Sequence, residues 1–204
     1  MIKYFVRTTG ERELDKTYSQ IEYELLIDKN GNSGKAFLSQ LSIIDKYDCV
    51  VLEDDLILCR DFKEKIEKVI SEHKNEIINF FTSPMRYFKS KQSKYFTYNQ
   101  CTYFPKGIGN KIYESIKFDN DTHNSQEKIM HRALVKMNLK HFQYRPCLVQ
   151  HIDNNSLMGH NVYFSRRSPY FEDYLNDLHI NYESAFLYKQ QLLNYMEKYF
   201  KTLK

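Results

Sequence analysis

The sequence lacks any apolar run of the roughly 20 residues that a transmembrane helix needs. The opening segment Met1 to Val6 is followed at once by Arg7, so the apolar core of a secretory signal does not develop. Low-complexity blocks are missing and 42% of the residues are hydrophobic, which argues against intrinsic disorder. We therefore expect a soluble cytoplasmic protein, large enough at 204 residues to bury a core.

Cysteine is scarce and scattered. Its four residues, Cys49, Cys59, Cys101 and Cys147, form neither a CxxC pair nor a Cys/His zinc spacing. This pattern favours buried free thiols in a reducing compartment over a disulfide framework. Internal repeats and linkers are also missing, so we expect one domain spanning 1–204.

Charge is distributed unevenly although the net charge is only +4. From residue 86 to residue 167 basic side chains outnumber acidic ones, which would favour a polyanionic partner. An ordinary solvated lysine-rich surface explains the same pattern, and the sequence leaves both interpretations open. The basic residues of this region include Arg86, Lys89, Lys91, Lys94, Lys106, Lys111, Lys117, Lys128, Arg132, Lys136, Lys140, Arg145, Arg166 and Arg167.

Strand and helix patterns alternate through the first half of the chain. This alternation predicts an α/β fold with a mainly parallel central sheet flanked by helices. We expect strands at 2–6, 24–28, 49–52, 77–82 and 142–149, a hairpin or edge strand at 95–104, and helices beginning at Ser33, Asp61, Gly107 and Ser125, with a final helix at 184–203.

The stretch CVVLEDDLIL, residues 49–58, places Glu53, Asp54 and Asp55 at the end of a buried strand. Ligands bind beyond the carboxyl ends of parallel strands. Uncompensated carboxylates at such a position repel one another, and Mg²⁺ or Mn²⁺ would remove that conflict. Alternation along an extended chain sends Glu53 and Asp55 to one side and Asp54 to the other. The simpler interpretation is that the aspartates begin a turn.

Two motifs resemble the GT-A family of nucleotide-sugar glycosyltransferases. The strand followed by Glu53-Asp54-Asp55 is similar to the metal-binding aspartate motif of that family. The segment Pro146-Cys147-Leu148-Val149-Gln150-His151 resembles a Pro-x-Leu-Val-Gln-His-Ile-Gly segment found in several of its subfamilies, with Asp153 where those proteins have glycine. The resemblance extends to about Ser156.

The resemblance implies a GT-A-like fold and a set of roles. Asp55 and His151 would be ligands of Mn²⁺ or Mg²⁺, which bridges the donor diphosphate, and Glu53 and Asp54 would support them or contact the sugar. Residues 1–60 would bind the nucleotide sugar, with uridine as the expected base, and 77–156 would form the acceptor half. The remaining donor-binding candidates are Arg7, Thr8, Thr9, Asp28 and Lys35.

An inverting transferase also needs a base for the acceptor hydroxyl. In the resembling subfamilies this acid begins the helix that precedes the Pro-x-Leu-Val-Gln-His segment. Glu127 is the best candidate here and Asp121 the second. A glutamate in the first turn of a helix also has an ordinary role, because it complements the helix dipole.

The acceptor and two rival functions stay open. Basic residues interleaved with aromatic ones allow a DNA acceptor, such as a hydroxymethylated pyrimidine in phage DNA, and equally a glycan, lipid-linked or protein acceptor. Clustered carboxylates also serve metal-dependent nucleases and phosphatases. An inactive nucleotide-sugar-binding module is the third alternative. The oligomeric state is not specified by the sequence.

Overall fold

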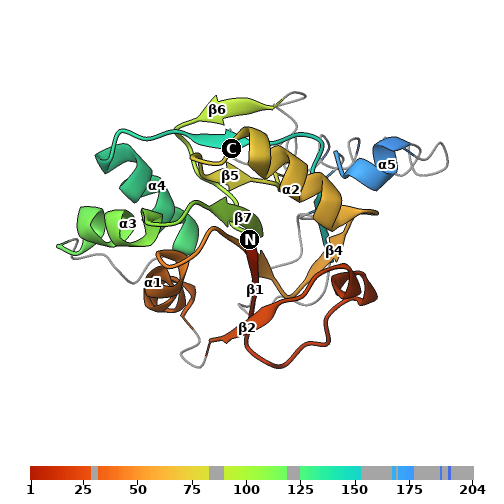
Figure 1. Cartoon of the computed structure of the whole chain (residues 1–204), viewed down its shortest axis with the longest axis horizontal. Coiled ribbons are helices and arrows are strands. Elements are labelled where there is room, and N and C mark those ends of the chain that lie inside the picture. Colours follow the sequence, from red (N-terminus) through yellow and green to blue (C-terminus); the bar gives the residue numbers. More distant parts are fainter. Residues whose placement is uncertain are drawn as a thin grey trace, which may run out of the picture.

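Seven strands form a mixed central sheet in the order β2-β1-β3-β7-β5-β8-β6, which runs from the bottom to the top of Figure 1. The computed structural model describes residues 1–28, 32–82, 90–118, 125–152, 167–168, 170–176, 189 and 193. With helices on its two faces, the sheet makes an α/β domain that fits a Rossmann-like fold. None of the helices in these ranges is long and apolar enough to cross a membrane.

The first half of the chain forms the predicted parallel part of the sheet. Strand β1 (Lys3–Thr8) pairs in parallel with both β2 (Glu24–Ile27) and β3 (Cys49–Glu53). The connections are the 3₁₀ helix η1 (Lys16–Gln20) and α1 (Ser33–Ile44). The carboxyl ends of all three strands therefore meet at one edge. Asn32, and not the predicted Ser33, caps α1, because its side chain accepts the Lys35 N–H at 2.9 Å.

The second half makes the sheet mixed, because two of its four strands run against the direction that β1, β2 and β3 share, so the predicted mainly parallel arrangement is confirmed only in part. Strand β7 (Cys101–Phe104) runs antiparallel to its two neighbours, β3 and β5 (Ile78–Asn79). Strand β8 (His141–Gln143) is parallel to β5, and β6 (Lys91–Ser93) closes the edge antiparallel to β8. The predicted hairpin or edge strand at 95–104 instead supplies the fully buried central strand β7. A buried apolar run marks a covered strand but carries no signal for its direction.

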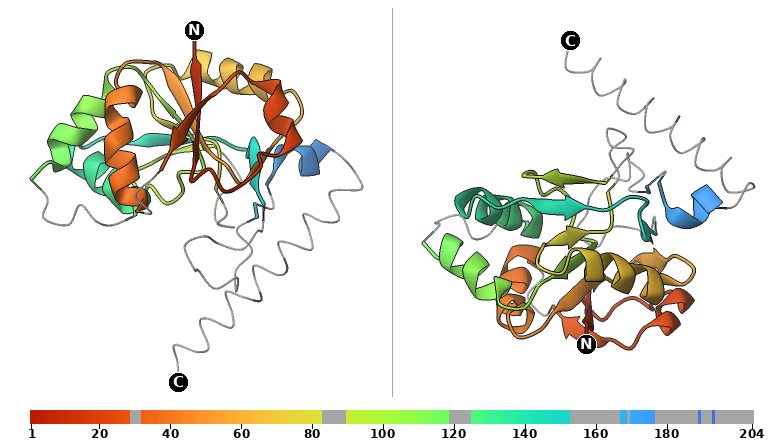
Figure 2. Two further views of the ribbon diagram at one scale, coloured as in Figure 1. Left: turned by 90° about the horizontal axis from the view of Figure 1, so that it is seen from below. Right: turned by 45° about the horizontal axis from the view of Figure 1, so that its top comes forward.

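Alternating side chains of the strands supply two cores, one on each face of the sheet. On one face, η1 and α2 (Phe62–Glu72) pack against residues such as Val6 and Leu52. On the other, α1, α3 (Ile108–Ile116) and α4 (Gln126–Lys136) pack against Phe5 and Val51. Figure 2 shows α1, α3 and α4 gathered on one side of the sheet, with η1 on the opposite side.

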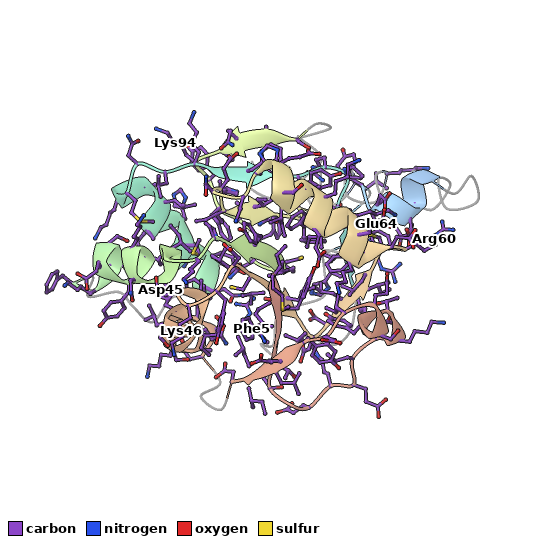
Figure 3. The ribbon with its side chains drawn as sticks, in the orientation of Figure 1. Phe5, Asp45, Lys46, Arg60, Glu64 and Lys94 are labelled. Carbon is purple, nitrogen blue, oxygen red and sulfur yellow. The ribbon has the colours of Figure 1, made fainter. Side chains whose placement is uncertain are left out.

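Helix α3 lies unusually close to the C-terminal end of α1, where Figure 3 labels Asp45. A Cβ atom on Gly109 would lie 2.1 Å from the backbone oxygen of Leu41, so only glycine allows this approach. Asp45 holds the contact by accepting the backbone N–H of Asn110 at 2.9 Å and its side-chain N–H at 2.8 Å. Helix α3 is thereby fixed to the C-terminal end of α1.

A second, two-stranded sheet joins β4 (Leu56–Leu58) to β9 (Val149–His151) in antiparallel register. The helix α5 (Glu172–Asn176) follows later in the chain. The predicted final helix at 184–203 lies outside the described residues except for Lys189 and Leu193. The division into a donor half and an acceptor half stays a prediction.

Candidate metal centre

The small sheet brings together two motifs that lie far apart in the sequence. Leu56, the first residue of β4, is registered against His151, the last residue of β9. The backbone oxygen of Asp55 also accepts the N–H of Ile152 at 2.8 Å. Backbone pairing therefore places Asp55 beside His151, at the carboxyl end of β3.

Glu53, Asp55 and His151 form one cluster. Each offers a ligand atom, and these three atoms lie within 4.8 Å of one another. The His151 Nε2 atom is 3.4 Å from Asp55 Oδ2, and both side chains are largely buried, with exposed fractions of 6% and 12%. The resemblance implies that Glu53 supports the ligands or contacts the sugar, and in the structure Glu53 is the third member of the cluster.

Asp54 is not a member of this cluster and lies in the bend that follows β3. Its Oδ2 accepts the hydroxyl of Thr8 at 2.6 Å, and its Oδ1 lies 3.4 Å from Arg12 Nη1. Thr8 also accepts the backbone N–H of Gly10 at 2.8 Å, which anchors the loop after β1. Asp54 thus holds the loop that carries Arg12.

Two arginines compensate the carboxylates, so the premise that their charge is unpaired is wrong. Arg12 Nη1 donates to Asp55 Oδ2 at 2.6 Å, and Arg7 Nη2 donates to Glu53 Oε1 at 3.1 Å. Arg7 and Glu53 are register partners on the neighbouring strands β1 and β3, which puts their side chains on the same face. Arg12 comes from an irregular loop, and no periodicity marks it in the sequence.

Further contacts fix Glu53 from three sides. The side chain of Gln126, at the start of α4, donates to Glu53 Oε1 at 2.8 Å. The Tyr18 hydroxyl donates to the backbone oxygen of Glu53, and Arg7 bridges to the backbone oxygen of Asn99 at 2.8 Å. Neither Gln126 nor Tyr18 was predicted from the sequence, since a polar residue beside a helix start or within an apolar cluster has many ordinary roles.

The two carboxyl groups of the cluster differ in acidity. Burial raises the pKa of Glu53; the charges of Asp55 and Glu127 act in the same direction, against the lowering effect of Arg7 and His151. Burial alone would also raise the pKa of Asp55, but its interactions with His151 and Arg12 outweigh that effect and lower it. Asp55 is therefore the better anchor for a cation over a wide pH range.

The donor set fits a divalent cation. Asp55 Oδ1 and both ring nitrogens of His151 are buried and make no hydrogen bond. Leaving such an atom unsatisfied costs about 1–3 kcal/mol, and one bound ion would satisfy Asp55 Oδ1 and one of the two ring nitrogens. Two carboxylates suit Mn²⁺ or Mg²⁺, and the imidazole shifts the preference toward Mn²⁺. Glu53, Asp55 and His151 can thus hold a metal ion.

The remaining donor-binding candidates differ in their surroundings. Arg7 contacts Glu53 of the cluster and Thr8 contacts Asp54, whereas the Thr9 hydroxyl is buried without a hydrogen-bond partner. Asp28 is half-buried beside the end of β1, where its N–H donates to the Thr8 backbone oxygen at 2.8 Å. Lys35 is exposed in the first turn of α1.

Glu127 lies in the first turn of α4, next to Gln126. It lines an open groove of about 440 Å³ together with Phe96, Thr97, Lys128, His131 and Arg132. The second base candidate, Asp121, and the glycine-replacing Asp153 both lie outside the described residues, as do the basic and aromatic residues predicted within 83–89 and 153–166.

Comparisons with known proteins support the fold alone. The sequence matches no family model and no curated protein. Among solved structures, the crystal structure of A197 from STIV is similar to this chain with a TM-score of 0.50 and 11% sequence identity. The likeness covers 75% of this chain and 86% of A197. The α/β architecture is therefore shared with a distant neighbour, and the chemistry must be argued from the site.

Proposed function

We propose that this protein is a metal-dependent, GT-A-like glycosyltransferase that moves a sugar from a nucleotide sugar, with uridine diphosphate as the expected carrier, to an acceptor hydroxyl. The observation that carries the proposal is the cluster of Glu53, Asp55 and His151 at the carboxyl end of β3. Glu53 and Asp55 come from the first motif that resembles the GT-A family, and His151 comes from the second. Both motifs contribute to one buried cluster, which is the arrangement that the resemblance implies.

Asp55, His151 and Glu53 are the proposed ligands. A bound Mn²⁺ would stabilise the negative charge that develops on the diphosphate leaving group. Arg7 and Gln126 hold Glu53 in place, and the β4–β9 pairing holds Asp55 against His151. These supports are backbone pairs and partly buried hydrogen bonds within the protein itself. The three ligand side chains would therefore be held in position before the donor binds.

The donor would bind across the ends of β1 and β2, next to this cluster. In this proposal, Asp28 and Thr9, whose hydroxyl makes no hydrogen bond, would contact the ribose or base, and Lys35 would contact phosphate or a sugar carboxylate. Arg7 and Thr8 act indirectly, because their side chains are already committed to Glu53 and Asp54. Binding at the carboxyl edge of parallel strands is the general rule for this architecture.

Glu127 is the proposed base that takes the proton of the acceptor hydroxyl during an inverting displacement. It opens onto the groove on one side, and its neighbour Gln126 contacts Glu53 on the other. Two consecutive residues in the first turn of α4 therefore have different neighbours: Gln126 contacts the metal ligand Glu53, and Glu127 lines the groove. Asp121 stays the second candidate. A product that retains the donor configuration, seen by NMR, would remove the need for this base.

The test is Mn²⁺-dependent turnover of a panel of nucleotide sugars by the whole chain. We expect release of the nucleoside diphosphate from one donor, and a loss of at least about a hundredfold in Asp55→Asn, because a ligand to the catalytic ion is removed. Asp61→Asn is the matched control, since Asp61 is exposed and its side chain makes no capping hydrogen bond.

A thermal-shift measurement separates the alternatives. Stabilisation by a nucleotide sugar only when Mn²⁺ is present, without turnover, would indicate an inactive binding module. Cleavage of phosphodiesters or phosphomonoesters, lost in Asp55→Asn, would indicate a nuclease or phosphatase. Full donor turnover by Asp55→Asn would contradict the proposed metal centre.

A further inference from the structure

The groove along α4 has a chemistry of its own. Its lining includes three basic side chains, Lys128, His131 and Arg132, and one carboxylate, Glu127. Lys128 and Arg132 are four residues apart, so they lie on the same side of the helix. Two cations, Lys128 and Arg132, along an open groove are suited to an anionic ligand with more than one charge.

An exposed aromatic ring borders the same groove. Tyr95 is 71% exposed, and its ring stacks on that of His131 with a centroid distance of 5.6 Å and an interplanar angle of 11°. The neighbouring Phe96 is buried and forms part of the groove wall. An exposed tyrosine ring lacks the favourable free energy that burial of its apolar surface would give. A flat ligand that stacks on the ring would supply that free energy.

A further cation extends this surface. Lys94 directly precedes Tyr95 and is exposed, and Figure 3 places it at the edge of the molecule near α4. An exposed aromatic ring flanked by lysine and arginine is the combination that binds single-stranded nucleic acid, because bases stack on the ring while phosphates meet the cations. A small phosphorylated sugar would use the cations but would not need the platform.

We propose that the α4 groove binds a single-stranded or locally unpaired nucleic-acid segment and presents one of its hydroxyl groups to the metal centre as the acceptor. The transfer step rests on the proposed function, whereas the binding step does not. In that transfer, the acceptor oxygen bonds to the anomeric carbon as the bond from that carbon to the phosphate oxygen breaks. The electron pair leaves with the nucleoside diphosphate, and the hydroxyl proton goes to Glu127.

The experiment measures binding of a fluorescein-labelled single-stranded oligonucleotide of about 12 nucleotides by anisotropy across a salt series, with the whole chain. Lys128→Glu should weaken binding about tenfold or more and flatten the salt dependence, whose slope falls by about 0.7 for each phosphate that the protein no longer neutralises. Tyr95→Ala should weaken binding by about five- to a hundredfold.

Matched controls keep this test specific. Lys68→Glu makes the same charge change on the exposed side of α2, which packs on the other face of the sheet. Tyr113→Ala removes another exposed tyrosine, on α3. Both should bind like the unaltered protein. Equal weakening by Lys68→Glu, or unaltered binding by both groove variants, would overturn the inference.

Donor turnover, measured in parallel, separates the two proposals. Oligonucleotide binding that depends on Lys128 and Tyr95, without any sugar transfer or donor turnover, supports the groove assignment and removes the transferase. Donor turnover without oligonucleotide binding removes the groove assignment and leaves the transferase in place. Displacement of the oligonucleotide by an equal concentration of a phosphorylated monosaccharide would also overturn the choice of a nucleic acid.

Discussion

Replacing Arg12 by alanine should make the protein bind Mn²⁺ more tightly, although the change removes a residue of the site. Arg12 Nη1 donates to Asp55 Oδ2 at 2.6 Å, and the same oxygen faces His151 Nε2 at 3.4 Å. A cation that binds between His151 and this oxygen must compete with the guanidinium for it, whereas a cation bound only at Asp55 Oδ1 would not. Arg12 therefore acts as a built-in competitor of the metal ion.

The size of the effect follows from the hydrogen bond that must be given up. A hydrogen bond between charged groups contributes about 1.5–3 kcal/mol. The Arg12 side chain is 16% exposed and the Asp55 side chain 12%, so water screens this contact only partly. Since about 1.4 kcal/mol corresponds to a factor of ten, Arg12→Ala should lower the Kd for Mn²⁺ by about ten- to a hundredfold.

Isothermal titration of Mn²⁺ into the metal-free protein measures this difference directly. Arg60→Ala is the matched control, because Arg60 lies at the edge of the molecule (Figure 3), is 64% exposed and pairs with Asp173 at 3.7 Å. Circular dichroism before titration checks that both variants are folded. Unchanged Mn²⁺ binding by Arg12→Ala would refute the competition. Weaker Mn²⁺ binding would also refute it and would show that Arg12 instead holds Asp55 in its ligand position.

Two further predictions concern stability. Burial lowers the pKa of His141 to about 4, from an ordinary value of 6.5, so the unfolded chain takes up the proton first as the pH falls. Stability should be full above about pH 6.5 and decrease by about 3 kcal/mol on the way to pH 4, and urea unfolding of His141→Leu should lack that decrease. Gly109→Ala would place a Cβ 2.1 Å from the Leu41 backbone oxygen and should destabilise the protein by about 1–3 kcal/mol. An unchanged Tm would contradict the close approach of α3 to α1.

Local sequence signals predicted the elements of the first half well. The alternation of β1, β2, α1 and β3 is visible because covered strands and amphipathic helices differ in period and length. The same signals were insufficient for β7. The segment 95–104 predicted a hairpin or edge strand, whereas the antiparallel place of β7 between β3 and β5 depends on pairing with distant segments. Strand direction is a property of the pairing, and a single strand does not carry it.

The candidate site divides in the same way. The sequence by itself determined which residue types could hold a cation, and the alternation expected of an extended chain grouped Glu53 with Asp55. In the structure β3 ends at Glu53, and both aspartates lie in the bend that follows. Only the tertiary structure decided that His151 reaches Asp55, because that contact is made by the β4–β9 register. It also decided that Arg7 and Arg12 neutralise the acids. Charge compensation acts through space over a few ångströms, and the chain order of the charges does not encode it.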